Sequence, residues 1–270
     1  MLSIIISSYK PDYFSALEKN IAETCGIPYE IIKIDNPGLM GICEAYNKGA
    51  AKARFDNLLF LHEDVEFVNQ NWGREIIIRL QQEKIGVIGL AGSNYVPFSP
   101  FAWWEHLKNT FINIIQCDQN KNIIKKYSLI QDINTITLDG VFLSCRKNLF
   151  NEYKFDEAIK GFHGYDLNFS TRVAEKYTNI ICHSIVLKHF SEGNPDRKWL
   201  EELIENRKAF KAPTYQKTDK QLEAYFFIKY IALLKKFNLP FKNVLHFINP
   251  KYIGWKLSLQ TFLKLLFSNK

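Results

Sequence analysis

Apolar and polar positions alternate along the first third of the chain in blocks that are typical of an α/β domain. Short apolar, β-rich runs occur at residues 2–8, 29–35, 57–65 and 85–93. Segments with apolar residues at helical spacing separate these runs. The first follows the run at residues 2–8 and ends at about Cys25, and the other two cover residues 41–53 and 71–83. This alternation predicts an α/β fold with a mostly parallel central sheet flanked by helices.

Polar side chains follow three of these predicted strands, at the point where each strand ends. They are Ser8 and Tyr9, Asp35 and Asn36, and His62, Glu63 and Asp64. In open α/β sheets the ligand crevice lies outside the carboxyl ends of the strands, so we expect these side chains to lie along one edge.

The middle of the chain, about residues 94–135, is rich in aromatic residues and Asn and has weak periodicity. We interpret it as an insertion or a long loop system, with a β-hairpin around "NIIKKYSLI". The stretch "TITLDGVFLSCRKNLF" predicts a strand followed by a helix start. "FDEAIKGFHGYDLNFSTRVAEKY" predicts a loop that enters a helix, and "NIICHSIVLKHFS" predicts either a strand pair or one long strand.

From about Pro195 onward the pattern is helical, with breaks at Pro213, Pro240 and Pro250. We therefore expect two domains: an α/β domain at residues 1–195 and a basic, apolar helical region at residues 196–270.

Composition and charge restrict the class of protein. Hydrophobic residues make up 47% of the chain, which is enough for a sizeable core. The five Cys are never spaced as CxxC, which argues against a disulfide framework or a zinc ribbon and fits a reducing cytosol. The N-terminus lacks a basic region and a cleavage site, and no apolar run is long enough for a transmembrane helix. We expect a cytoplasmic protein.

The net charge of +7 is concentrated in the tail. Residues 217–270 contain ten Lys against Asp219 and Glu223, whereas the preceding residues are close to neutral. The main body shows no grouped basic residues with stacking partners, so we do not expect nucleic acid as a partner.

The order of these features resembles family 2 type glycosyltransferases with the GT-A fold, which is Rossmann-like. The matching stretches are "SIIISSYKP", "EIIKIDNP", "GICEAYNKGAAKARFDNLLFLHEDV", "LDGVFLSCRK", "FDEAIKGFHGYDLNFSTRV" and "HSIVLKHF", which together cover roughly residues 2–192. The chain is most similar to bacterial members that carry a His-x-Asp variant of the metal motif.

The resemblance implies a site for a divalent metal, Mn²⁺ or Mg²⁺. The family carries Asp-x-Asp where this chain has His62, Glu63 and Asp64. Asp64 matches the residue that contacts the metal, and His189 matches a late histidine that completes the site in many GT-A enzymes. His62 replaces the first Asp, whose usual contact is to the ribose or to a metal-bound water. An imidazole as a direct ligand would favour Mn²⁺ over Mg²⁺. The structural alternatives are a solvated strand end for "HEDV" and a structural role for His189.

The resemblance also implies residues that bind the nucleotide sugar. Asp35 matches a nucleoside-binding acid, although it could equally form an Asx-turn with "NPG". Tyr9, next to Ser8, lies where a ring could stack near the base. Asn47 falls in "AYNKG", which resembles the family's ARN-x-G motif. Asp139 in "LDGVF" matches the loop on the donor-sugar or acceptor side. His62 and Glu63 complete this group.

Asp166 in "GYD" matches the family's catalytic carboxylate, the general base of inverting members. The family usually has an acidic pair here, whereas Tyr165 precedes Asp166 in this chain. One carboxylate is sufficient for a base within hydrogen-bond reach of the acceptor hydroxyl. The structural alternative is that Asp166 is the N-cap of the helix that follows.

The tail from residue 217 onward has two alternative explanations. It could be a helical cap that packs on the catalytic domain or on a partner subunit, which would make the protein a homo-oligomer. It could also contain an in-plane membrane helix whose Lys side chains are attracted to anionic lipid at the inner face of the cell membrane.

We therefore expect an inverting, metal-dependent glycosyltransferase that moves a sugar from a nucleoside-diphosphate sugar, a UDP-sugar, to a glycan or lipid-linked acceptor in bacterial surface polysaccharide or lipopolysaccharide assembly. Nucleotidyl transfer is a rival, but "SSYKPDY" lacks the Gly-rich loop that it would need. The other rival is a catalytically impaired nucleotide-sugar-binding or scaffold protein of the same fold, which the replacement by His62 suggests.

Overall fold

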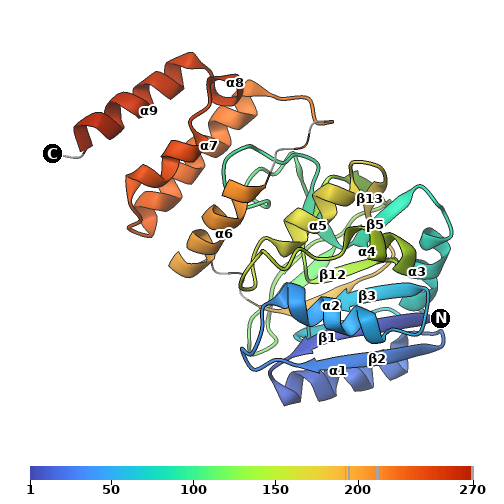
Figure 1. Ribbon diagram of the computed structural model, residues 1–270. Helices are drawn as coiled ribbons and strands as arrows, with labels where there is room; N and C mark the ends of the chain where they lie inside the picture. Colours follow the sequence, from blue (N-terminus) through green and yellow to red (C-terminus); the bar gives the residue numbers. More distant parts are fainter. Residues whose placement is uncertain (192, 194, 211–212, 214, 269–270) are drawn as a thin grey trace. The chain divides into compact units, whose positions relative to one another are not determined.

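A computed structural model describes residues 1–191, 193, 195–210, 213 and 215–268. The chain forms two compact units, which Figure 1 shows in sequence colours. The first unit contains residues 1–94 and 106–193, and the second contains residues 95–105 and 194–270. Residues 95–105, which lie within the predicted catalytic domain, therefore pack with the C-terminal helices. The division into two domains, at residues 1–195 and 196–270, stays a prediction.

The first unit is built on a seven-stranded sheet with the order β10-β13-β5-β12-β3-β1-β2. Its strands are β1 (Leu2–Ser8), β2 (Tyr29–Asp35), β3 (Asn57–Leu61), β5 (Ile85–Gly89), β10 (Ile133–Thr135), β12 (Phe142–Arg146) and β13 (Thr178–Ile181). β1, β2, β3, β5 and β13 share one direction, and only β10 and β12 run against them. The sheet is mixed but mostly parallel in direction, and the predicted α/β class is confirmed.

Helices lie on both faces of this sheet, as Figure 1 shows. They are α1 (Pro11–Thr24), α2 (Ile42–Lys52), α3 (Trp72–Leu80), α4 (Lys147–Tyr153) and α5 (Tyr165–Val173). On one face, Ile5, Phe60 and Leu143 form a core cluster with buried side chains of α2, α4 and α5. On the opposite face, Phe142 contacts Phe67, which stacks on Trp72 of α3. Alternate residues of each strand therefore face different helix layers, because successive strand side chains point to opposite faces.

Two small sheets extend the first unit. One has the order β4-β14-β8-β9 and the other β11-β6-β7. Their strands are β4 (Val65–Phe67), β6 (Ala91–Ser93), β7 (Thr110–Ile112), β8 (Ile114–Cys117), β9 (Ile123–Lys126), β11 (Thr137–Leu138) and β14 (Leu187–Phe190). The antiparallel pair β8–β9 is a hairpin of the kind predicted in the middle of the chain. The stretch "NIICHSIVLKHFS" forms two strands and not one long strand, because β13 lies in the seven-stranded sheet and β14 in the four-stranded sheet.

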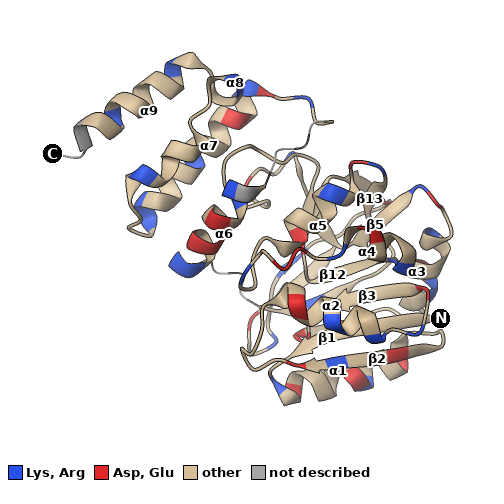
Figure 2. Ribbon diagram, viewed as in Figure 1, with Lys and Arg blue, Asp and Glu red and all other residues tan. Residues whose placement is uncertain are grey.

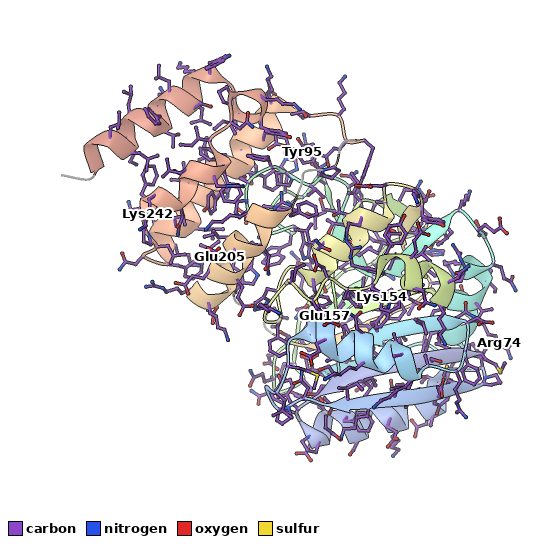
Figure 3. All side chains as sticks on the ribbon, viewed as in Figure 1. Arg74, Tyr95, Lys154, Glu157, Glu205 and Lys242 are labelled. Atoms are coloured by element: carbon purple, nitrogen blue, oxygen red, sulfur yellow. The ribbon has the colours of Figure 1, made fainter. Side chains whose placement is uncertain are left out.

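The second unit is helical. It contains α6 (Arg197–Ala209), α7 (Lys220–Lys236), the 3-10 helix η1 (Phe241–Phe247), α8 (Pro250–Ile253) and α9 (Trp255–Ser268). Pro240 precedes η1 and Pro250 begins α8, as the predicted breaks require. Buried Glu223 of α7 accepts hydrogen bonds from the hydroxyl of Tyr95 (labelled in Figure 3) and from the N–H of Phe98, which ties residues 95–105 to this unit. Within the described part of the chain, no helix is both long and apolar enough to cross a membrane.

The close packing of α2 on β1 depends on Gly49. A Cβ at this position would overlap Cγ2 of Ile5 and touch Ile34. We expect Gly49→Ala to lower the free energy of unfolding by roughly 1–2 kcal/mol, because overpacking outweighs the gain of about 1 kcal/mol in helix propensity. Urea unfolding measures this change.

The same substitution in an Ile5→Ala background is the control. Without Cγ2 the overlap is gone, so Gly49→Ala should then be neutral or stabilising. An equal loss in both backgrounds would contradict this account of the packing.

Candidate active site

The segment His62–Asp64 connects two sheets. β3 ends at Leu61 in the large sheet, and β4 begins at Val65 in the four-stranded sheet. Leu61 and Val65 are both buried, and the N–H of His62 donates to the carbonyl of Val141 (3.1 Å). Because both ends of this three-residue segment are held, its side chains have fixed directions.

Glu63 points into the protein and holds the loop that follows β1. Its carboxylate is 4% exposed and accepts three hydrogen bonds, from the hydroxyl of Ser8 (2.7 Å) and from the N–H groups of Tyr9 (3.1 Å) and Lys10 (3.0 Å). The predicted nucleotide-sugar role of Ser8 and Glu63 stays a prediction, since their polar groups already bond to each other. Their observed contacts position Tyr9, whose ring is 60% exposed.

His62, Asp64 and His189 form a cluster of potential metal ligands. One donor atom from each lies within 4.8 Å of the others. Nδ1 of His62 is 3.8 Å from Oδ1 of Asp64, and Nε2 of His189 is 3.6 Å from Oδ2 of Asp64. Donor atoms bound to one ion at about 2.1 Å lie about 3–4 Å apart, so these separations fit a shared cation.

Strand pairing brings His189 to Asp64. β14 runs antiparallel to β4 with His189 opposite Val65, and the N–H of Phe190 donates to the carbonyl of Asp64 (2.9 Å). Burial lowers the pKa of His189, although the Asp64 carboxylate opposes this shift. A lowered pKa favours the neutral imidazole, which is the form that binds a metal.

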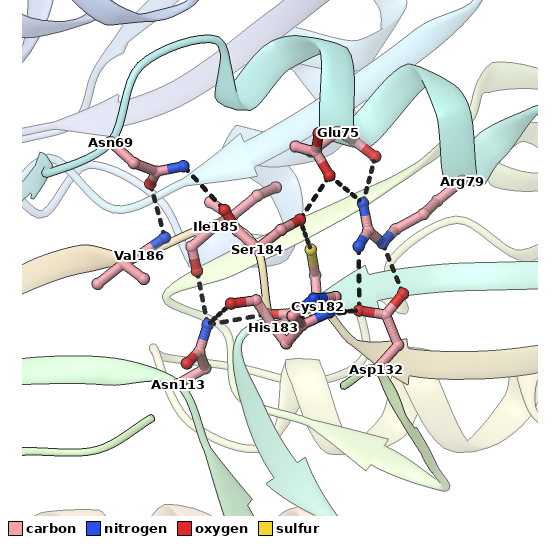
Figure 4. A network of polar contacts seen from close by, with 10 residues as sticks. All are labelled: Asn69, Glu75, Arg79, Asn113, Asp132, Cys182, His183, Ser184, Ile185 and Val186. Carbon is pink, nitrogen blue, oxygen red and sulfur yellow. Dashed lines mark hydrogen bonds and ion pairs between the residues drawn. The ribbon is translucent and has the colours of Figure 1, made fainter. Parts of the chain in front are cut away.

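A network of polar contacts holds the turn that leads into β14 (Figure 4). The side-chain amide of Asn113 donates to the carbonyls of Cys182, His183 and Ile185, and Asp132 accepts from both Arg79 and the N–H of His183. These contacts fix the segment that carries His189. No sequence pattern identified Asn113 or Asp132, because their partners are main-chain groups and side chains distant in sequence.

Tyr165 sets the orientation of His62. Its hydroxyl donates to the carbonyl of Gly140 (3.1 Å) and lies 3.1 Å from Nε2 of His62. Since the hydroxyl proton goes to that carbonyl, Nε2 of His62 must be the donor, which leaves Nδ1 unprotonated toward Asp64. A Cβ on Gly140 would overlap the Tyr165 hydroxyl, so this contact requires glycine. The position of Tyr165, directly before Asp166 where the family has an acid, was the signal that could have identified it.

Asp166 lies in the first turn of α5 and not at its N-cap, which is Gly164, so the N-cap alternative is wrong. Its Oδ2 accepts from the N–H of Gly140 (2.9 Å) and its Oδ1 from the N–H of Leu167 (2.8 Å). Burial, followed by the negative charge of Asp139, raises the pKa of Asp166 to about 7. A carboxyl with this pKa exchanges protons near neutral pH, as a general base must.

The predicted site residues Asp35 and Asp139 bond to neighbouring residues of the chain. Asp35 is opposite Ser8 in the β1–β2 register and is exposed, paired with Lys33 (2.7 Å). The turn after it is held by Asn36, whose side chain bonds both main-chain groups of Met40, so the Asx-turn does not involve Asp35. Half-buried Asp139 accepts from the N–H of Val141 (3.0 Å).

Asn47 lies on α2 and binds the loop that precedes α5. Its amide donates to the carbonyl of Phe155 (2.9 Å) and to Glu157 (labelled in Figure 3), and its oxygen accepts from the N–H of Phe155 (3.2 Å). Phe155 packs against the ring of Tyr165. The observed role of Asn47 is therefore to position the loop beneath Tyr165 and Asp166, and its predicted ligand contact stays a prediction.

The structure thus joins His62, Asp64 and His189 to Asp166 through Tyr165 and Gly140. Comparisons with known proteins identify the family and the fold. A family model described as "Glycosyltransferase like family" matches residues 3–225. The chain belongs to this family. No curated protein matches the chain significantly.

Solved glycosyltransferases share the fold of this family member. The mannosyltransferase PcManGT from Pyrobaculum calidifontis, in complex with GDP-Man and Mn²⁺, is similar with a TM-score of 0.56 and 12% identity, over 100% of this chain and 88% of that one. TarS 1–349 from S. aureus, in complex with UDP-GlcNAc, has a TM-score of 0.52 and 12% identity, over 87% and 73%.

GalNAc-T7 with UDP, GalNAc and Mn²⁺ has a TM-score of 0.54 and 12% identity, over 88% of this chain and 53% of that one, so the present chain spans about half of that protein. At these identities the likeness shows the fold alone. The predicted GT-A fold of this glycosyltransferase is confirmed.

The donor set of the cluster fits Mn²⁺ better than Mg²⁺. Two imidazoles and one carboxylate face one point, and imidazole suits transition metals whereas Mg²⁺ demands oxygen ligands. We expect Mn²⁺ to bind to the wild-type protein and binding to fall by more than tenfold in Asp64→Asn and in His189→Ala. Electron paramagnetic resonance of free Mn²⁺ during a titration measures this.

Two further variants sharpen the measurement. Tyr165→Phe removes the hydroxyl that orients His62 and should weaken binding by roughly tenfold. His246→Ala, which alters an exposed histidine in the second unit, should leave binding unchanged. Equal affinity in Asp64→Asn and wild type would exclude this cluster as the metal site.

Proposed function

We propose that this glycosyltransferase transfers a sugar from a nucleoside-diphosphate sugar, a UDP-sugar, to a hydroxyl group with inversion at the anomeric carbon. The observation that carries the proposal is the cluster of His62, Asp64 and His189, linked through Tyr165 and Gly140 to a carboxyl whose pKa is about 7. The UDP, UDP-GlcNAc and GDP-Man in similar structures support a nucleotide-sugar donor.

His62, Asp64 and His189 would hold a divalent ion, Mn²⁺ in preference to Mg²⁺. Such an ion would neutralise negative charge on the departing diphosphate. The chain itself supplies rigid positioning, because strand pairing fixes Asp64 and His189 and the Tyr165 hydroxyl fixes His62. Positioned charge of this kind stabilises a transition state without reorganisation during the reaction.

Asp166 would accept the proton of the attacking hydroxyl. Its carboxylate is held by two main-chain N–H groups, and the half-buried position leaves it accessible to an acceptor. The raised pKa makes the ionised form a stronger base than an ordinary Asp. A base separate from the metal cluster fits an in-line attack, and therefore inversion.

Tyr9 and Asp35 would contact the nucleoside. Both are exposed; Tyr9 follows β1 and Asp35 ends the adjacent strand β2, at the carboxyl end of the sheet. The ring of Tyr9 can stack on a base, and the Asp35 carboxylate can accept from a ribose hydroxyl or a base N–H. A glycan or lipid-linked acceptor, action in bacterial surface polysaccharide assembly, a cytoplasmic location and a homo-oligomeric state are further parts of the proposal that rest on the family resemblance.

A screen of UDP-, GDP- and dTDP-sugars for Mn²⁺-dependent hydrolysis tests the proposal. We expect one donor class to be hydrolysed, and Asp166→Asn to reduce kcat of transfer by roughly 10²–10⁴-fold with little change in calorimetric UDP affinity. Asp118→Asn, in the turn between β8 and β9, is the matched control and should retain full activity.

The catalytically impaired scaffold is the alternative outcome of this screen. It would bind UDP without turning over any donor, and Asp64→Asn would not alter its UDP affinity in Mn²⁺. This combination of results would refute the proposed activity.

The pH dependence of kcat/KM provides a separate prediction. Only ionised Asp166 can accept a proton, so activity should rise with pH through about 7. Asp139→Asn removes a negative charge that helps to raise this pKa, so the rising limb should move to lower pH, by roughly half to one unit. A limb that stays in place or moves to higher pH would contradict the assignment of Asp166 as the base.

A further inference from the structure

Helix α9 carries a row of large apolar side chains that face solvent. Trp255 is 81% exposed, and the other members are 42–58% exposed. The row consists of Trp255, Leu259, Phe262, Leu263 and Leu266. Separations of four, three and four residues place Trp255, Leu259, Phe262 and Leu266 on one face of the helix, and Leu263 extends that face.

The opposite face of α9 carries two small hydroxyl residues toward the protein, beside buried Leu265 of the core cluster. Ser258 is 5% and Thr261 4% exposed. Their hydroxyls donate to the carbonyls of Gly254, directly before α9, and of Leu257 (2.8 Å each), so burial leaves neither group without a partner. A helix on the surface of a water-soluble protein usually turns its large apolar residues inward, whereas most of the large apolar residues of α9 face solvent.

The charge of this region has one sign. Residues 224–270 contain eight Lys and no Asp or Glu. Figure 2 shows α9 with blue but no red segments. Lys256 and Lys264 of α9 are exposed, and the Lys264 ammonium also lies over the ring of Phe241 (5.0 Å). An apolar face beside exposed ammonium groups is the pattern of an interfacial helix.

We infer that α9 docks on an anionic phospholipid surface, in the plane of the membrane, with the apolar row inserted at the boundary between headgroups and acyl chains. The lysines determine the choice of occupant. A second copy of this segment would bring like charges together, whereas anionic headgroups attract Lys side chains close to the surface. Trp255 suits the boundary between headgroups and acyl chains, because its indole has an apolar body and one polar N–H.

This docking goes beyond the proposed function and does not depend on which sugar is transferred. It would hold the glycosyltransferase at the surface where a lipid-linked acceptor resides. The experiment therefore measures lipid binding and not turnover, so its failure is distinct from a failure of the proposed activity.

Sedimentation of the full chain with vesicles tests the inference. We expect the protein to sediment with phosphatidylglycerol-containing vesicles and much less with pure phosphatidylcholine. The variant Trp255→Gln/Leu259→Gln/Phe262→Gln should lose roughly tenfold or more in partitioning for each side chain. Lys256→Gln/Lys264→Gln should weaken binding by roughly fivefold per lysine.

The matched control is Leu107→Gln/Ile123→Gln/Ile130→Gln. It replaces three equally exposed apolar side chains of the first unit and should bind vesicles as wild type does. All of the substituted side chains are exposed, and circular dichroism checks that each variant is folded.

Fluorescence gives a second readout. Binding to vesicles should shift the tryptophan emission to shorter wavelength, and brominated lipid should quench it; both effects should be largely lost in Trp255→Phe. Unchanged vesicle binding by the Trp255/Leu259/Phe262 variant would overturn the inference. So would a dimer in sedimentation equilibrium that this variant abolishes, combined with no binding to vesicles, because α9 would then be an interface between copies.

Discussion

The arrangement of the site depends on one constraint, which is that three residues must cross from one sheet to another. Leu61 is buried in the large sheet and Val65 in the small one, so the segment between them has little freedom. Successive side chains leave it in different directions: His62 toward Tyr165, Glu63 toward the loop after β1, and Asp64 toward His189. One short segment thus joins the potential metal ligands to the loop that presents Tyr9.

Gly140 connects the two halves of the site through its main chain. Its carbonyl accepts from the Tyr165 hydroxyl, which orients His62, and its N–H donates to Asp166. Movement of this loop would therefore disturb the potential metal ligands and the proposed base together. Buried tyrosine hydroxyls normally have a hydrogen-bond partner, and the hydroxyl of Tyr165 has two. Tyr165 can therefore be accommodated directly before Asp166, where the family usually has an acidic residue.

The second unit achieves stability differently and leaves part of its surface apolar. Its core is formed by side chains of α6, α7, η1, α8 and α9, and buried Glu223 is satisfied by Tyr95 and Phe98. Burial raises the pKa of Glu223, and these donors together with Arg207 counteract the rise. Because the hydroxyls of Ser258 and Thr261 bond to the carbonyls of Gly254 and Leu257, α9 can turn most of its large side chains outward without leaving these two buried hydroxyls unsatisfied.

The strand–helix alternation, the α/β class and the helical C-terminal region could be derived from the sequence, because the period of apolar residues depends only on local geometry. The family resemblance identified Asp64, His189 and Asp166 as candidates. Only the tertiary structure decided that Ser8, Glu63 and Asn47 bond inward, and that Tyr165, Asn113 and Asp132 hold the site. Their partners are main-chain groups or side chains from 16 to more than 100 residues away, and no local pattern records such a contact. The sequence by itself determined which elements form and which residues are candidates for the chemistry, whereas the direction in which each polar side chain points was decided by packing between sheets.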